Sequence, residues 1–243
     1  LIPKESQKYY SEKIIYLPNT YQARDSSLKI SDKIFKREEL GLPKNAFVFC
    51  CFNQNNKITP NIFDIWMRIL KTVDKSVLWL LEDNSIAVKN LRKEAKKRKI
   101  DPKRIIFAKR MSMTNHFARH KCADLFIDTF PYGAHTTCSD SLWAGLPIVT
   151  LMGKSFASRV GGSLLNAINL EELITITEKE YEKLIMELAN NSYRLKEIRN
   201  KLHKNRFTEP LFDTKLYTKN IELAYTKIYE KHLNKLPAKN IDI

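Results

Sequence analysis

The sequence has no long apolar run and little glycine, and each shortage excludes a class of protein. Every apolar stretch among the 243 residues is short and interrupted by charge, so we expect no transmembrane helix. The first residues, LIPKESQKYYSEK, lack the apolar stretch of a signal peptide. With 6 glycines, 9 prolines and 43% hydrophobic residues, the composition is neither fibrous nor disordered. We expect one large domain, or one domain with an appendage.

Cysteines are few and follow no CxxC spacing. Cys50 and Cys51 are adjacent inside an apolar run, and Cys122 and Cys138 stand apart from them. This usage predicts buried, reduced thiols, and we therefore expect a cytoplasmic protein.

Positive charge is in excess, with a formal net charge of +15 at pH 7. The densest cluster is KNLRKEAKKRK, residues 89–99, where apolar residues are so few that we expect a largely solvated helix face. Nucleic-acid binding is an alternative, but no base-stacking aromatic residues are interleaved with the cluster. A positive field would equally attract a diphosphate substrate.

From residue 46 onward, apolar strand patterns alternate with helical ones. The expected strands cover 46–52, 76–81, 104–108, 123–128, 147–151 and 172–176. One expected helix starts at Pro60. The other expected helices cover 86–99, 112–121, 136–144, 155–167, 178–190, 192–205 and 214–233. This alternation predicts an α/β fold with a doubly wound, mostly parallel sheet. Residues 1–45 are polar without a clear period, and we expect a connector from an N-terminal lobe that this chain does not include.

The segment ADLFIDTFPYGAHTTCSDSLWAGLPIVT, residues 123–150, has the clearest chemical pattern. A buried strand ends at Asp128, and His135-Thr136-Thr137 opens a helix after a loop. Free N–H groups and hydroxyls at a helix start attract a phosphate, and Asp140, one turn on, could accept ribose hydroxyls. The alternative is that a threonine only caps the helix and Asp140 favours its positive end. No GxGxxG fingerprint is present, which argues against a dinucleotide cofactor.

The run HTTCSDSLWAGLPIVT resembles the signature of the family 41 glycosyltransferases, the O-linked N-acetylglucosamine transferases and their bacterial relatives. Other stretches agree with that family in order and spacing: YYSEKIIYLPNTYQ, FNQNNKITP, SVLWLLEDN, GKSFASRVGGSLL and FTEPLFDTKLYTKNIELAY. The resemblance covers essentially the whole chain, and we identify it as a bacterial-type member. It implies the Rossmann-like C-terminal lobe of a two-lobed GT-B enzyme, with UDP bound mainly to this lobe at residues 46–243.

The resemblance also implies a phosphate site. Gln54 and Lys57 match the family's phosphate-contacting pair, and Lys57 follows the first strand, where it could stabilise a leaving diphosphate. His135, Thr136 and Thr137 match residues that bind the phosphates. Taken without the family, Gln54 and Lys57 would be an exposed polar turn.

A nucleoside site is implied in the same way. Asp140 matches the ribose-binding carboxylate, and Met111 stands where the family reads uracil through backbone groups. His116 and Arg119 match residues that stack on the base or form hydrogen bonds near it. Met113 departs from the pattern, because some members have a lysine there. We expect that contact to be absent or supplied by Arg110.

The implied activity is inverting transfer of a sugar from UDP-N-acetylglucosamine, or another UDP-hexose, to Ser or Thr hydroxyls of proteins. The resemblance implies that no metal or other cofactor is needed, because GT-B enzymes stabilise the leaving UDP without a bound metal. Consistent with this, no His/Cys/Asp/Glu cluster in the site has metal-ligand spacing. No Ser-His-Asp or Cys-His arrangement is readable, which disfavours a covalent hydrolase. The expected partners are the acceptor protein, a first lobe that carries catalytic histidines, and tetratricopeptide repeats upstream. The alternatives are a nucleotide-sugar-binding module without activity and a UDP-glucose or UDP-galactose transferase.

Overall fold

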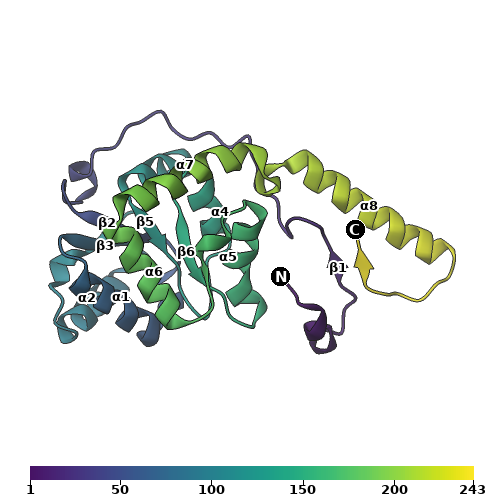
Figure 1. The fold of residues 1–243 in the computed structure, drawn as a ribbon, viewed down its shortest axis with the longest axis horizontal. Coiled ribbons are helices and arrows are strands. Elements are labelled where there is room, and N and C mark those ends of the chain that lie inside the picture. The colour runs from purple at the N-terminus through teal and green to yellow at the C-terminus, as the bar shows by residue number, and fades with distance from the viewer.

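Six buried parallel strands form the sheet at the centre of the molecule. In a computed structural model that describes all 243 residues, the strand order is β4-β3-β2-β5-β6-β7 and every neighbouring pair is parallel (Figure 1). The strands are β2 (Phe47–Cys51), β3 (Ser76–Leu81), β4 (Ile105–Ala108), β5 (Leu125–Ile127), β6 (Ile148–Leu151) and β7 (Ile174–Thr175). The predicted doubly wound α/β fold is confirmed.

Helices cover both faces of this sheet. They are α1 (Pro60–Thr72), α2 (Ser85–Lys97), α3 (Met113–Arg119), α4 (Thr136–Trp143), α5 (Phe156–Ala167), α6 (Glu178–Asn190), α7 (Ser192–Thr208) and α8 (Thr214–Leu233). Helix α1 packs against α6, whereas α4 packs against α3 and α5. Since a crossover between parallel strands is right-handed, the reversal of strand order after β4 places α1 and α4 on opposite faces.

Local sequence signals explain where the helices begin and end. At the start of α1 the Thr59 hydroxyl accepts a hydrogen bond from the Ile62 N–H, and Pro60 occupies the first helical position, where no donor is needed. Helix α4 ends before Gly145, whose φ of 83° is favourable only for glycine. Helix α2, the basic segment, buries only Ala95, so its predicted solvated face is confirmed.

Several predicted elements are shorter in the structure, and 3-10 turns lie at or near the start of three strands. The strand expected from residue 104 starts at Ile105, because Pro102–Arg104 form a 3-10 turn. The strand expected over 123–128 is limited to Leu125–Ile127, and the 3-10 turn His120–Cys122 ends two residues before it. Likewise Glu171–Leu173 form a 3-10 turn, which leaves β7 only two residues.

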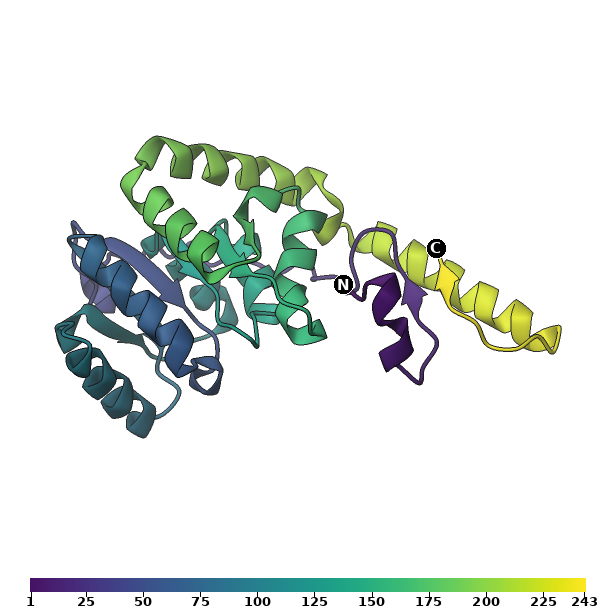
Figure 2. The same cartoon turned by 60° about the horizontal axis from the view of Figure 1, so that its bottom comes forward.

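The two ends of the chain pair with each other in an appendage, and this pairing was not predicted from the sequence. Strand β1 (Ile15–Tyr16) pairs in parallel with β8 (Ile241–Asp242) in a separate two-stranded sheet. Figures 1 and 2 both show α8 reaching away from the main sheet, with the N-terminal turn, β1 and β8 beside it. That residues 1–45 lead from an upstream lobe stays a prediction; within this structure, their first part lies against the C-terminal segment.

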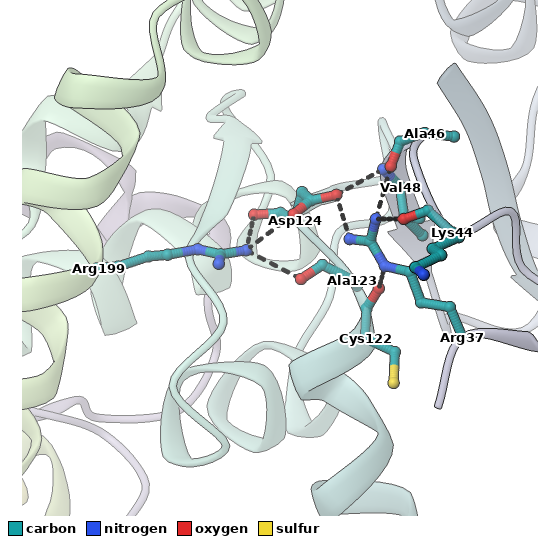
Figure 3. Close-up of polar contacts among 8 residues, drawn as sticks. All are labelled: Arg37, Lys44, Ala46, Val48, Cys122, Ala123, Asp124 and Arg199. Atoms are coloured by element: carbon teal, nitrogen blue, oxygen red, sulfur yellow. Dashed lines mark hydrogen bonds and ion pairs between the residues drawn. The ribbon is translucent and has the colours of Figure 1, made fainter. Parts of the chain in front are cut away.

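Residues 1–45, which we call the lead-in, are held to the sheet near their end by the carboxylate of Asp124. The side chain of Asp124 accepts from the Val48 N–H at 2.8 Å and from Arg37 Nη2 at 2.7 Å. Its second oxygen lies 3.5 Å from Nη2 of Arg199 on α7 (Figure 3). Arg37 also donates to the carbonyls of Cys122 and Ala46. Asp124 thus joins the lead-in, β2, β5 and α7.

We expect Asp124→Ala to lower the free energy of unfolding by about 2 kcal/mol. The substitution removes charged hydrogen bonds made by a side chain that is only 20% exposed. Urea denaturation measures this change. Asp74→Ala, an exposed aspartate after α1, is the control and should change stability by less than about 0.5 kcal/mol. Equal stabilities of the two variants would contradict a fastening role for Asp124.

Candidate functional site

The order of the strands defines where a ligand can bind. From β2 the chain builds outward through β3 and β4, then returns to place β5 on the other side of β2. In such sheets, ligands bind outside the carboxyl ends of the strands at this reversal point. The segments that follow β2 and β5 there are residues 52–59 and 128–135.

Lys57 comes from the first of these segments and contacts the second. Its Nζ donates a hydrogen bond of 3.0 Å to the Gly133 carbonyl and lies 4.1 Å from the centre of the Tyr132 ring. Partial burial lowers the pKa of Lys57, and the nearby Asp128 opposes that effect. A partly desolvated ammonium therefore stands beside the loop that leads into α4.

The start of α4 carries the predicted phosphate-binding residues. His135 precedes the helix, and no side chain caps its first turn. Thr136 is exposed and Thr137 is half-buried, with its hydroxyl donated to Asn53 Oδ1. Unpaired N–H groups in a first helical turn attract anions, and Lys57 would add a charge on the same side.

The His135 ring is held in place on two sides. It stacks on Tyr132 with ring centres 5.1 Å apart, and Nε2 lies 3.2 Å from the Ala157 carbonyl oxygen. A hydrogen bond there requires the proton on Nε2. Burial lowers the pKa of His135, so the ring is neutral near pH 7 and Nδ1 is left as an acceptor.

Beneath this surface lies a buried carboxylate that the sequence analysis did not select. Asp128 is 1% exposed and accepts hydrogen bonds from the N–H groups of Thr129 and Ala134, both at 2.7 Å. Asn53 Nδ2 and the Thr150 hydroxyl donate to it at 3.1 and 2.7 Å. Burial raises the pKa of Asp128 to about 6, against the effect of these donors. Polar residues at the ends of two apolar strands were the signal that could have found Asn53 and Asp128.

Asp140 lies on α4 as predicted, but its carboxylate is paired with Arg24 of the lead-in. The side chain is 7% exposed, and Oδ1 lies 2.5 Å from Nη2 of Arg24. The two atoms are not aligned as a hydrogen bond, so we describe the contact as an ion pair. Burial raises the pKa of Asp140 to about 6, and Arg24 opposes the rise. Ribose binding by Asp140 stays a prediction.

Two of the predicted base-binding residues, Met111 and His116, are half-buried near α3. The His116 ring lies 5.1 Å from that of Phe52 and 4.7 Å from that of His120. Burial, together with His120 and Arg119, lowers the pKa of His116 to about 2, so the ring is neutral. A neutral, partly exposed ring is suited to packing on a base.

Arg119 is buried in the structure. Its side chain is 1% exposed and lies over the Phe52 ring at 4.8 Å. Its Nη1 donates to the Lys109 carbonyl at 2.6 Å. The structure therefore places Arg119 under the loop that carries Met111, as a support for that loop. A contact between Arg119 and the base stays a prediction.

The remaining predicted contacts lie at the surface. Gln54 is exposed just before the turn that carries Lys57, and Met113 is 50% exposed. Nη2 of Arg110 lies 3.2 Å from a carboxylate oxygen of Asp83. No group of three or more His, Cys, Asp or Glu side chains is arranged to hold a metal ion.

An apolar groove lies away from this site. Its volume is about 500 Å³, and its lining comes from the lead-in, α5 and α8, including Tyr16, Phe156 and Tyr225. None of Lys57, Thr136, Thr137 and Asp140 lines it. We place the candidate site at the strand reversal, because a cation and the uncapped first turn of α4 lie close together there.

Comparison with known proteins gives a consistent result. The pattern of glycosyl transferase family 41 matches residues 25–221. An Arabidopsis thaliana protein named probable UDP-N-acetylglucosamine–peptide N-acetylglucosaminyltransferase SEC is 37% identical over 95% of this chain. A Caenorhabditis elegans UDP-N-acetylglucosamine–peptide N-acetylglucosaminyltransferase is 36% identical over 84% of it. The chain spans only 24% and 18% of these two relatives.

A solved structure agrees with the fold. The O-GlcNAc transferase of Thermobaculum terrenum superimposes with a TM-score of 0.79 at 26% identity. The match covers 94% of this chain and 43% of the other.

Proposed function

Because this chain belongs to glycosyl transferase family 41, we propose that it is the donor-binding lobe of a protein O-glycosyltransferase that uses UDP-N-acetylglucosamine. The sugar would pass with inversion to a Ser or Thr hydroxyl of an acceptor protein. Since the chain spans about a quarter or less of its curated relatives, the acceptor side would belong to a first lobe upstream. Tetratricopeptide repeats and the bacterial subgroup are further parts of the proposal.

The observation that carries the proposal is the contact between Lys57 and the loop entering α4. A diphosphate bound at Thr136 and Thr137 would meet N–H donors from the helix and the Lys57 ammonium from β2. As the bond between sugar and UDP breaks, negative charge grows on the diphosphate, and preorganised donors stabilise that charge. We propose that these groups replace a metal ion in stabilising the leaving group.

The nucleoside would extend from α4 toward α3. Asp140 would accept ribose hydroxyls once its contact with Arg24 is shared or released. The uracil would lie beside Met111 and His116, and Gln54 would approach the phosphates from the β2 side.

The experiment is calorimetric titration of the chain with UDP and ADP. We expect UDP to bind at least tenfold more tightly than ADP, because the residues proposed to face the base correspond to a uracil site. Lys179→Ala, an exposed lysine on α6, serves as the control and should leave UDP affinity unchanged. Equal affinity for both nucleotides, or tighter binding of ADP, would refute the donor assignment.

We also propose a cytoplasmic location. All four cysteines are buried and unpaired, as predicted, and burial raises the pKa of the thiols, so they resist oxidation. None of the helices has the length and apolarity needed to cross a membrane.

A further inference from the structure

We propose that Asn53 is a positioning residue that fixes the first turn of α4 opposite Lys57 and so sets the diphosphate site. This inference rests on the proposed function and deepens it, because Asn53 would not touch the donor itself. It would act through Thr137.

Every hydrogen-bonding group of the Asn53 side chain is used. Nδ2 donates to Asp128 Oδ1 at 3.1 Å and to the Thr129 hydroxyl at 2.7 Å, and Oδ1 accepts from the Thr137 hydroxyl. Asn53 is 1% exposed, so these bonds are protected from water. A fully satisfied buried network of this kind holds its members in one arrangement. Asn53 therefore joins β2, the end of β5 and α4.

Asp128 gives this arrangement a rigid base. Beyond its side-chain bonds, its carbonyl accepts from the buried Tyr181 hydroxyl at 2.8 Å. Glycines pack against the carboxylate: a Cβ added at Gly133 or Gly161 would lie 3.1 Å from Oδ2. Asp128 cannot shift without displacing these neighbours, so Asn53 is tied to a fixed point.

The same bonds decide what α4 can offer an anion. The Thr137 hydroxyl donates its proton to Asn53 Oδ1. Thr137 therefore presents its backbone N–H, and not its hydroxyl proton, to a ligand. Thr136 is exposed, and its hydroxyl can turn toward a phosphate. Lys57 follows Asn53 by four positions. One short segment therefore carries both the cation of the proposed site and the residue that holds the start of α4.

The test compares UDP with uridine, which lacks the diphosphate, by titration calorimetry. We expect Asn53→Ala to lower the ratio of UDP to uridine affinity about tenfold, the scale of one lost hydrogen bond, while uridine affinity is unchanged. Thr137→Val should lower the ratio by a similar factor. Because Asn53 acts through Thr137, the double variant should also lose about tenfold rather than a hundredfold.

Asn205→Ala is the matched control. Asn205 is a 5% exposed asparagine that donates to the Ile168 carbonyl at 2.8 Å, away from the site. Its loss should destabilise the fold but leave the affinity ratio unchanged. If Asn53→Ala does not fold, Asn53→Ser, whose shorter side chain cannot span to Thr137, carries the same expectation.

The outcomes separate this inference from the proposed function. If the wild-type chain binds UDP no more tightly than uridine, both fall. Suppose instead that the wild type binds UDP more tightly than uridine. The positioning role alone is then wrong if Asn53→Ala leaves the ratio of UDP to uridine affinity unchanged, or if the losses from Asn53→Ala and Thr137→Val add in the double variant. A loss of ratio in Asn205→Ala as large as in Asn53→Ala would also overturn it, because general destabilisation would then explain the effect.

Discussion

Lys57→Ala is expected to lower kcat about 100–1,000-fold when the chain is joined to a first lobe of the family, with a much smaller rise in KM for the UDP-sugar. Removing one preorganised donor from a developing anion typically has an effect of this size. The ammonium is partly desolvated and lies 3.0 Å from the loop before α4, so it is already in place when charge grows on the leaving diphosphate. An interaction that strengthens in the transition state changes kcat more than KM.

Steady-state kinetics with a peptide acceptor measure this effect. Lys179→Ala, the exposed lysine on α6, should leave both constants unchanged. A change confined to KM would make Lys57 a uniform binding contact, and no change in either constant would remove it from the catalytic machinery.

Asp128→Ala is expected to destabilise the fold by about 3–5 kcal/mol, because it leaves several buried donors without an acceptor. The donors are Asn53 Nδ2, the Thr150 hydroxyl and two backbone N–H groups. Guanidinium denaturation at pH 7 measures the loss. Asp32→Ala removes an exposed carboxylate in the lead-in and should cost less than about 0.5 kcal/mol. A loss from Asp128→Ala as small as this would show that the network contributes little.

The raised pKa of Asp128 gives that network a pH dependence. With a folded-state pKa of about 6 and an unfolded value of about 3.9, the folded chain binds more protons between pH 4 and 6. The contribution of this group to stability is therefore fully present below pH 4 and declines as the pH rises to 6. Relative to Asp128→Asn, which does not titrate there, the wild type should lose up to about 1.4 kcal/mol per pH unit across that window. Asp140 titrates in both proteins and cancels in the difference; a flat difference would contradict the raised pKa.

Much of the fold could be predicted along the chain. Continuous apolar runs such as 76–81 are typical of strands covered on both faces, and helical spacing after Pro60 predicted α1. The alternation of the two fixed the fold class, and motif spacing pointed to the family. These features are local, since propensity and hydrophobic period depend on neighbours within a few residues.

Contacts between distant segments could not be predicted in the same way. The pairing of β1 with β8 joins residues at opposite ends of the chain, and two residues per strand leave no readable period. The contact between Arg119 and the Phe52 ring likewise joins two separate segments, and no local pattern indicated it.

The sequence by itself determined the sheet, its helices and the segment around His135, Thr136 and Thr137, because each follows from local spacing and composition. Only the tertiary structure decided that Asn53 and Asp128, 75 positions apart, share a hydrogen bond beneath that segment, and that Arg24 pairs with Asp140. The physical reason is that burial and hydrogen-bond partners arise when parallel strands bring their carboxyl ends to one edge. Whether an aspartate is buried or exposed depends on neighbours from distant parts of the chain, which the residue type alone does not reveal.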